Sequence, residues 1–183
     1  MSTGLNLVSE LERLVTALGG DGDSAEAGQI SPGAVAERIA KSLGVRVDEV
    51  AILNVSQRWR HLHFLVPEAL KNVGYIPLSS NSALAARTAR ESRPEIVNDF
   101  PNVRHVTVFE GVKTGADAAE AIQKIISAPI LADGRVVGVI QVSRKSPHAL
   151  HSGRDFTADD LGRVLALCKP LGKLLQYFCP EKE

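Results

Sequence analysis

Hydrophobic and polar positions alternate most clearly over residues 127–143, the stretch around which the rest of the chain is organised. Two apolar runs meet at Asp133 and Gly134, which tolerate the positive φ angles of a tight hairpin turn. In the second run the even positions of 136–142 are apolar, whereas the odd positions change from valine to Gln141 and Ser143. This pattern predicts a hairpin whose second strand is central in a sheet, with one dry face and one mixed face.

A second segment, at residues 50–57, repeats this division into a dry and a mixed face. Asn54 and Ser56 share the mixed face, while Leu53 and Val55 lie on the other. Residues 58–60 predict a turn, and the returning strand at 61–66 alternates apolar residues with histidines. If polar positions pair across this hairpin, His63 lies beside Asn54, and we expect both on the same receptive face as Gln141.

Three helices have sequence signals at their ends. Leucines spaced by three and four residues predict an amphipathic helix over 5–18. Ser31 is the expected N-cap of a second helix that stops at Gly44. Thr157 and Asp160 form a capping-box pattern at the start of a long C-terminal helix, within which a proline at 170 is expected to introduce a kink.

The middle of the chain is less regular. Ser80, Asn81 and Ser82 precede a helix that Pro94 ends, and exposed backbone N–H groups at such a helix start can hold an anion or a carbonyl oxygen. We expect a short strand at 95–98 and a longer strand at 103–109. A capping box at residues 114–117 then predicts a helix over 115–126.

Composition and charge exclude several classes of protein. Among 183 residues, 21 Lys and Arg balance 21 Asp and Glu, which argues against a dedicated binder of nucleic acid or of an acidic membrane. Neither a membrane-spanning run nor a signal peptide is recognised, so we expect a cytoplasmic protein. We expect two parts: an N-terminal helix with a flexible loop over 1–31, and one domain over 32–183.

The order of these segments resembles that of the GAF domain family. The segments VAILNVSQ, HLHFLVP, SSNSALAARTARESRPEIVND, SAPILADGRVVGVIQVSRK and FTADDL follow one another as they do in that family. The resemblance implies an α/β fold of three layers: an antiparallel sheet of five or six strands, terminal helices on one face, and a small-molecule pocket on the other. It also implies ligand sensing and dimerisation in signal transduction.

Departures from the family pattern narrow the chemistry. Members that bind cyclic nucleotides have an Asn-Lys pair followed downstream by Phe-x-x-x-Asp-Glu. Phe156 and Asp160 match this pattern, but Ser143-Arg144 or Arg144-Lys145 stands in place of the Asn-Lys pair, and Leu161 follows the aspartate. Bilin-binding members and members that reduce free methionine sulfoxide use pocket cysteines. Here the only cysteines are Cys168 and Cys179 in the last helix, so we expect no such chemistry and no enzyme.

The candidate ligand-binding residues are polar side chains on the mixed strand faces and at the start of the third helix. Each also has a structural explanation, as a sheet residue bonded to a loop or as a helix cap. The candidates are Asn54, Ser56, His63, Ser80, Asn81, Ser82, His105, Thr107, Gln141 and Ser143.

Three functional hypotheses remain open. The first is a regulatory domain that binds an unidentified small molecule and couples it to a homodimer formed by the terminal helices. The second is a dimerisation or scaffold module without a ligand. The third is a metal or haem sensor that uses His63 or His105; His61 and His63 project from one strand face, but no third metal ligand lies near them in the sequence. The sequence does not identify a cofactor.

Overall fold

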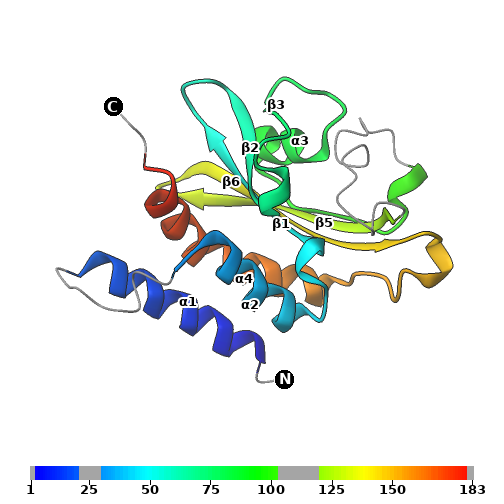
Figure 1. The fold of residues 1–183 in the computed structure, drawn as a ribbon, viewed down its shortest axis with the longest axis horizontal. Coiled ribbons are helices and arrows are strands. Elements are labelled where there is room, and N and C mark those ends of the chain that lie inside the picture. Colours follow the sequence, from blue (N-terminus) through cyan, green and yellow to red (C-terminus); the bar gives the residue numbers. More distant parts are fainter. Residues whose placement is uncertain (1–2, 21–29, 103–119, 181–183) are drawn as a thin grey trace.

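The structure, a computed structural model, describes residues 3–20, 30–102 and 120–180. It is a mixed α/β fold built on a six-stranded antiparallel sheet in the order β3-β2-β1-β6-β5-β4 (Figure 1). The strands are β1 (Val50–Ser56), β2 (His61–Val66), β3 (Ile76–Pro77), β4 (Glu95–Val97), β5 (Ala121–Ala132) and β6 (Arg135–Ser146). The helices are α1 (Thr3–Gly19), α2 (Pro32–Leu43), α3 (Leu84–Glu91) and α4 (Ala158–Phe178).

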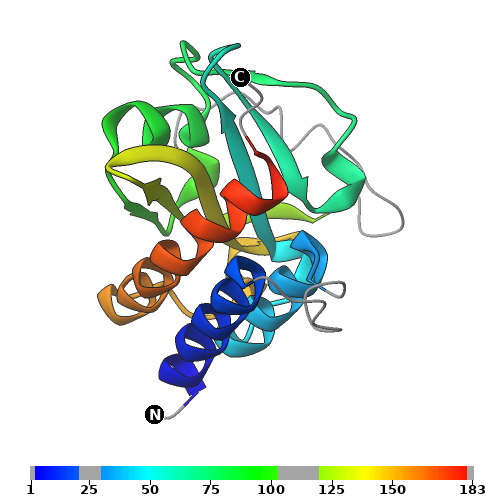
Figure 2. The same cartoon turned by 90° about the vertical axis from the view of Figure 1, so that its left-hand side faces the viewer.

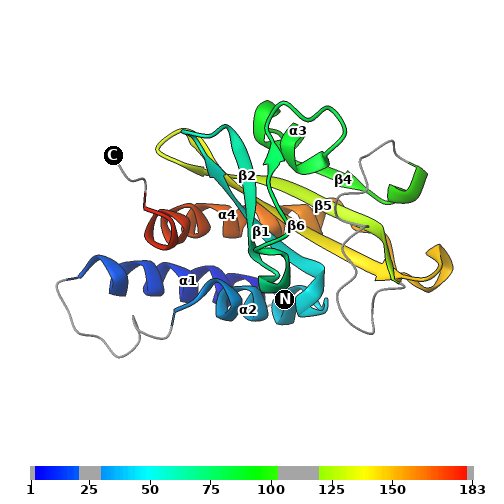
Figure 3. The same cartoon turned by 45° about the horizontal axis from the view of Figure 1, so that its top comes forward.

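The sheet separates two unequal layers of helices (Figure 2). Helices α2 and α4 pack on one face, and α1 packs on both of them, so that α1, α2 and α4 lie side by side (Figure 3). We call this the terminal-helix face; its core includes Ile52, Ile126 and Ile140. The α3 face carries a second cluster with Leu53, Phe64 and Val139. The predicted three-layer architecture is therefore confirmed.

The sequence signals for the terminal helices are confirmed. Ser31 Oγ accepts a hydrogen bond from Ala34 N at the start of α2, and Gly44 ends this helix in the left-handed conformation, with φ of 66°. Leu7 and Leu11 of α1 are buried against the partner helices. Most of the stability of these helices therefore comes from burying an apolar face rather than from helix propensity.

The capping box of α4 is present and is reinforced by an arginine. Thr157 Oγ1 accepts from Asp160 N (3.3 Å), and Asp160 Oδ2 accepts from Thr157 N (2.8 Å). Arg154 adds two hydrogen bonds to the same carboxylate, at 2.7 and 2.8 Å. Arg154, followed by the hydrogen bonds from Thr157, lowers the pKa of Asp160 well below its usual range.

The central hairpin is also confirmed and is longer than predicted. Asp133 and Gly134 form the turn with φ angles of 52° and 76°. Next to the turn the ladder pairs Ala132 with Arg135. Farther from the turn, beginning with the pair of Ile130 and Gly138, the register is shifted by one residue, because β6 contains a bulge.

The prediction of a helix over 115–126 is wrong where the structure can test it. Residues from Ala121 onward belong to β5. The isoleucines Ile122, Ile125 and Ile126 are spaced as on a helix, but a strand buried on both faces also has apolar residues at every position. Residues 103–119, which include the predicted strand with His105 and Thr107, lie outside the described part of the chain.

The prediction that Asn54 and Gln141 share one receptive face is wrong as well. Asn54 follows Ile52 on the terminal-helix face, whereas Gln141 lies on the α3 face with Val139. For β6 the mixed face does point away from the terminal helices, as expected; for β1 the assignment is reversed. Alternation shows which residues of one strand share a face, but not which layer covers that face.

Candidate functional site

A relay of buried polar side chains connects the central strands to α3. Gln141 Nε2 donates to Ser127 Oγ (3.2 Å), and Thr88 Oγ1 lies 2.7 Å from Ser127 Oγ. Thr88 Oγ1 also donates to Leu84 O (2.9 Å), which leaves Ser127 as the donor to Thr88. All three polar side chains are buried, and Ser127 is fully inaccessible. Hydroxyl and amide groups at this depth require partners, and here each supplies one to the next.

The start of α3 is held by its own hydrogen bonds. Ser80 Oγ accepts from Ala83 N (3.2 Å) and lies 3.4 Å from Ser82 Oγ, while Asn81 is exposed. Arg90 Nη1 donates to Leu78 O (2.5 Å) and to Ser80 O (2.6 Å). The N-cap of α3 is Ala83, which makes no side-chain cap hydrogen bond, so the predicted capping of this helix by a serine is wrong; Ser80 instead holds the loop that leads into α3.

Gln141 and Ser143 both lie on the α3 face of β6, but they have different partners. Ser143 Oγ donates to the backbone carbonyl of Glu49 at 3.4 Å, and Ser143 is opposite Ile125 in the ladder. Of the ten predicted site residues, Gln141 belongs to the relay to α3 and Ser143 lies two residues further along the same face. His105 and Thr107 lie outside the described residues.

Asn54, Ser56 and His63 come together on the opposite, terminal-helix face. The ladder pairs Asn54 with His63, as predicted from the alternation. Together they line an open groove of about 780 Å³ between the β1–β2 turn and the last turn of α4, which we call the hairpin groove. Trp59 and Leu175 form parts of its opposite walls. The ten candidates therefore do not form one site.

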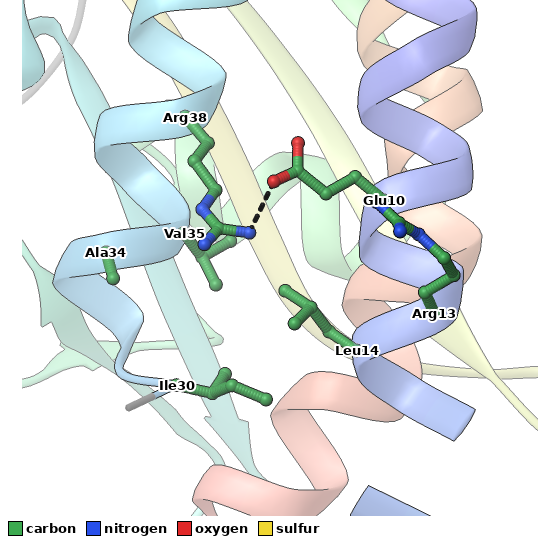
Figure 4. A pocket seen from close by; sticks show the side chains of 7 residues that line it. All are labelled: Glu10, Arg13, Leu14, Ile30, Ala34, Val35 and Arg38. Atoms are coloured by element: carbon green, nitrogen blue, oxygen red, sulfur yellow. Dashed lines mark hydrogen bonds and ion pairs between the residues drawn. The ribbon is translucent and has the colours of Figure 1, made fainter. Parts of the chain in front are cut away.

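A smaller hollow of about 250 Å³ lies between α1 and α2 (Figure 4). Arg38 of α2 reaches across it to Glu10 of α1, with an Nη1–Oε1 distance of 2.7 Å. Leu14 and Ile30 provide its apolar part. Because both members of the ion pair are partly exposed, this contact contributes at most about 1 kcal/mol to holding the helices together.

The histidines offer little support for a metal site. Burial, followed by the neighbouring His61 and Lys71, lowers the pKa of His63, and its buried Nδ1 has no hydrogen-bond partner among the residues that the structure describes. His61 stacks against Tyr75 with ring centroids 4.2 Å apart. Among the residues that the structure describes, no group of three or more potential ligands could hold a metal ion.

Both cysteines lie on or beside α4, on the terminal-helix face. Cys168 is buried in the main core, where burial raises the pKa of its thiol to about 12. Cys179 forms the C-cap, and burial raises its pKa too. Thiols whose pKa is raised carry little thiolate at neutral pH and are poor nucleophiles.

None of the helices in the described ranges is long and apolar enough to cross a membrane.

A comparison with protein-family models decides the family. A GAF domain model matches residues 33–176. The chain belongs to the GAF domain family. The GAF domain is a regulatory and sensor fold found in signalling proteins. The assignment of this chain to the family agrees with the layered sheet described above.

Solved GAF-type structures share this fold at low sequence identity. The GAF domain of an Acinetobacter phosphoenolpyruvate-protein phosphotransferase is 14% identical with a TM-score of 0.64, covering 97% of this chain and 95% of that one. Residues 122–287 of a methyl-accepting chemotaxis protein are 12% identical with a TM-score of 0.62, covering 96% and 99%. The free methionine-R-sulfoxide reductase of Neisseria meningitidis, solved with its substrate, is 16% identical with a TM-score of 0.59, covering 96% and 92%. No curated protein sequence gives a significant match.

Sequence reasoning missed Thr88 and Ser127 of the relay. Ser127 is a polar residue between the apolar runs 125–126 and 128–131 of β5, and Thr88 is the one polar member of the buried residues of α3. Both signals were visible in the sequence as polar residues at positions expected to be buried. Their connection was not visible, because it depends on the shifted register of the β5–β6 hairpin.

Proposed function

We propose that this GAF domain is a regulatory domain that binds a small molecule on the α3 face of its sheet and transmits binding to the terminal helices. The observation that carries the proposal is the Gln141–Ser127–Thr88 relay. It places amide and hydroxyl groups between the central strands and the short helix α3. A polar ligand could exchange these internal hydrogen bonds for its own without leaving a buried group unpaired.

The two faces of the sheet support this division of labour. On the terminal-helix face, the central positions Ile126, Ile140 and Val142 are buried and apolar. On the α3 face, neighbouring positions of the same strands are Ser127 and Gln141. An apolar layer suits permanent packing, whereas polar groups that converge within an apolar surrounding suit the orientation of a ligand.

A route for transmission is built into β5 and β6. Both strands contact α3 on one side and α4 on the other. Ile126 on the α4 side and Ser127 on the α3 side are adjacent residues of β5, so a change in the position of Ser127 moves the backbone beneath α4. A ligand shifts the packing of the helices only to the extent that it binds one arrangement more tightly than the other.

A thermal-shift screen against soluble metabolites tests the ligand proposal. We expect at least one compound to raise the melting temperature. At 100 times its Kd, such a compound adds about 2.7 kcal/mol to the free energy of unfolding. The effect should disappear in Gln141→Leu, because that variant lacks the amide that donates to Ser127. If no compound stabilises the protein, or if Gln141→Leu responds like the wild type, the α3-face site is wrong.

Gln123→Leu is the matched control for this experiment. Gln123 is also a buried glutamine on the central hairpin, but its amide donates to Ser146 O (2.8 Å) rather than to the relay. Gln123→Leu therefore removes a buried amide, as Gln141→Leu does, but it breaks a hydrogen bond to a different partner. We expect Gln123→Leu to retain the ligand-induced shift even though its own melting temperature falls.

We further propose that the domain acts without covalent catalysis. The only thiols, Cys168 and Cys179, lie on the terminal-helix face, away from the relay, and their raised pKa values disfavour thiolate chemistry. Free methionine sulfoxide belongs in the same compound panel. We expect it to be recovered unreduced after incubation with the protein and dithiothreitol.

Dimerisation through the terminal helices is the final part of the proposal. Leu165 on α4 is 39% exposed, whereas other apolar residues of α4, such as Val164 and Leu171, are buried in the core that α4 forms with β5 and α1. We expect the protein to sediment as a dimer at high micromolar concentration, and Leu165→Glu to shift it to monomer. Leu150→Glu is the control, because Leu150 lies in a short 3-10 helix (Ala149–His151) where its side chain is 95% exposed. A wild-type monomer at all concentrations would exclude a homodimer.

A further inference from the structure

The hairpin groove has features that the proposed ligand site on the α3 face does not explain. It lies on the opposite face of the sheet and has a volume of about 780 Å³. It is bordered by the β1–β2 turn on one side and by Leu175, Gln176 and Cys179 of the last turn of α4 on the other. A volume of this size is within the range that holds a small organic molecule.

One wall of the groove combines an aromatic ring with a cation. The side chain of Trp59, the only tryptophan of the chain, is 66% exposed. The guanidinium carbon of Arg58 lies 5.0 Å from the centre of its ring. An exposed tryptophan beside an arginine offers a flat apolar surface and a planar charged group for recognition of carboxylates.

The floor of the groove contains polar groups whose hydrogen-bonding capacity is not used up by the protein. Within the described part of the chain, the Asn54 amide makes one hydrogen bond, to Val55 O, at the limiting distance of 3.5 Å. His63 Nδ1 is buried and meets no hydrogen-bond partner from residues 3–20, 30–102 or 120–180. The lowered pKa favours the neutral ring at pH 7, which has one donor and one acceptor. These two side chains face each other as a pair of the β1–β2 ladder.

The charged side chains that line the groove are positive and therefore favour a negatively charged ligand. Of the described side chains that line it, the charged ones are Arg58 and Arg135, and none is acidic. Nearby, Gln176 Nε2 donates to Asp133 Oδ2 at 3.3 Å, so the acidic side chain next to the groove already has a partner. Val137 and Leu175 add apolar surface suited to a hydrocarbon ring rather than to a sugar or a phosphate.

From these observations we propose that the hairpin groove is a second binding site, which takes a small planar aromatic carboxylate. The carboxylate pairs with Arg58 and accepts from Asn54, while the ring lies between Trp59 and Leu175. Such a ligand connects the β1–β2 turn to the last turn of α4. It therefore acts on the end of the same helix that the α3-face site would influence from beneath.

The single tryptophan permits a direct test by NMR. The indole N–H of Trp59 gives one resonance in the side-chain region of a ¹H–¹⁵N spectrum, and the probes are benzoate, benzamide and acetate. We expect benzoate to shift this resonance saturably. Benzamide lacks the charge and acetate lacks the ring, and each should bind about tenfold more weakly or not at all.

Variants determine whether the binding uses the proposed residues. Arg58→Gln should weaken benzoate binding about tenfold, and Asn54→Leu several-fold. Arg93→Gln, which removes an arginine that is 72% exposed and paired with Glu91, should bind as the wild type does. Gln141→Leu should also leave benzoate binding unchanged, which separates this site from the α3 face.

Three results would overturn the proposal. They are the absence of a saturable shift with benzoate at millimolar concentration, equal shifts with acetate, and unchanged affinity in Arg58→Gln. The α3-face proposal would survive each of them, because its own test depends on Gln141 and on other ligands.

Discussion

Substitution of Gly172 by alanine should destabilise the protein more than any other single methyl addition on α4. The added Cβ would clash with the backbone carbonyl oxygen of Leu131 on β5, and a carbonyl of the ladder cannot rotate away. Helix α4 would have to move off the sheet that it covers. We expect a loss of about 3 kcal/mol, typical of severe overpacking, measured as a fall in melting temperature of about 6–12 °C.

Gly162 of the same helix provides the matched control. A Cβ at Gly162 meets no atom within 4 Å, so Gly162→Ala adds helix propensity without a clash. We expect it to raise stability by up to about 1 kcal/mol. If both substitutions raise the melting temperature, α4 does not lie as closely against β5 as described.

Replacing Asp160 by asparagine should cost about 1–3 kcal/mol at pH 7, since it weakens both the capping box and the bidentate contact with Arg154. The effect should depend on pH. The pKa of Asp160 is lowered in the folded protein, so its stabilisation is present above the unfolded value of about 4 and is lost as the pH falls below it. The wild type should therefore approach the variant in urea-unfolding measurements as the pH is lowered from 5 to about 2.

Asp159→Asn isolates the capping contribution. Asp159 is in the same first turn and carries the same charge, but it is exposed and takes no part in the capping box. Both substitutions remove one favourable interaction with the helix dipole, which is about 0.3–1 kcal/mol. Equal losses in the two variants would contradict the role assigned to the Arg154–Asp160 pair.

Elements with local end signals were predictable from the sequence. Ser31 and Gly44 mark α2, Thr157 and Asp160 mark the start of α4, and Asp133-Gly134 marks the central turn. In each case the signal is a side-chain cap or a positive φ angle, which needs no knowledge of distant residues. The family resemblance added the layered arrangement, which the domain match confirms.

The candidate site was less predictable, because it depends on register. A two-residue turn at Asp133-Gly134 without a bulge would pair Ser127 with Ile140. The bulge in β6 moves its partner to Gln141 and so creates the polar relay. A bulge of one residue exchanges the pairing of every following position. The extra residue is Val137, which is typical of regular strands; the neighbouring Gly138 is compatible with a bulge but does not fix its position.

The division of the polar candidates between two faces has a related cause. Asn54 and Gln141 both occupy polar positions in otherwise apolar strands, and alternation alone gives no layer assignment. In the structure Asn54 pairs with Gly138 on the terminal-helix side, where the groove begins, whereas Gln141 pairs with Ala51 on the α3 side. One predicted pocket thus becomes two distinct surfaces.

Backbone amide hydrogen exchange, with and without the compound that raises the melting temperature most, tests the ligand proposal most directly. We expect slower exchange in α3 and in the part of β5 around Ser127, with a smaller change in α4, because the relay connects the first two and β5 lies beneath the third. Protection confined to the β1–β2 turn, with α3 unchanged, would contradict a ligand site on the α3 face.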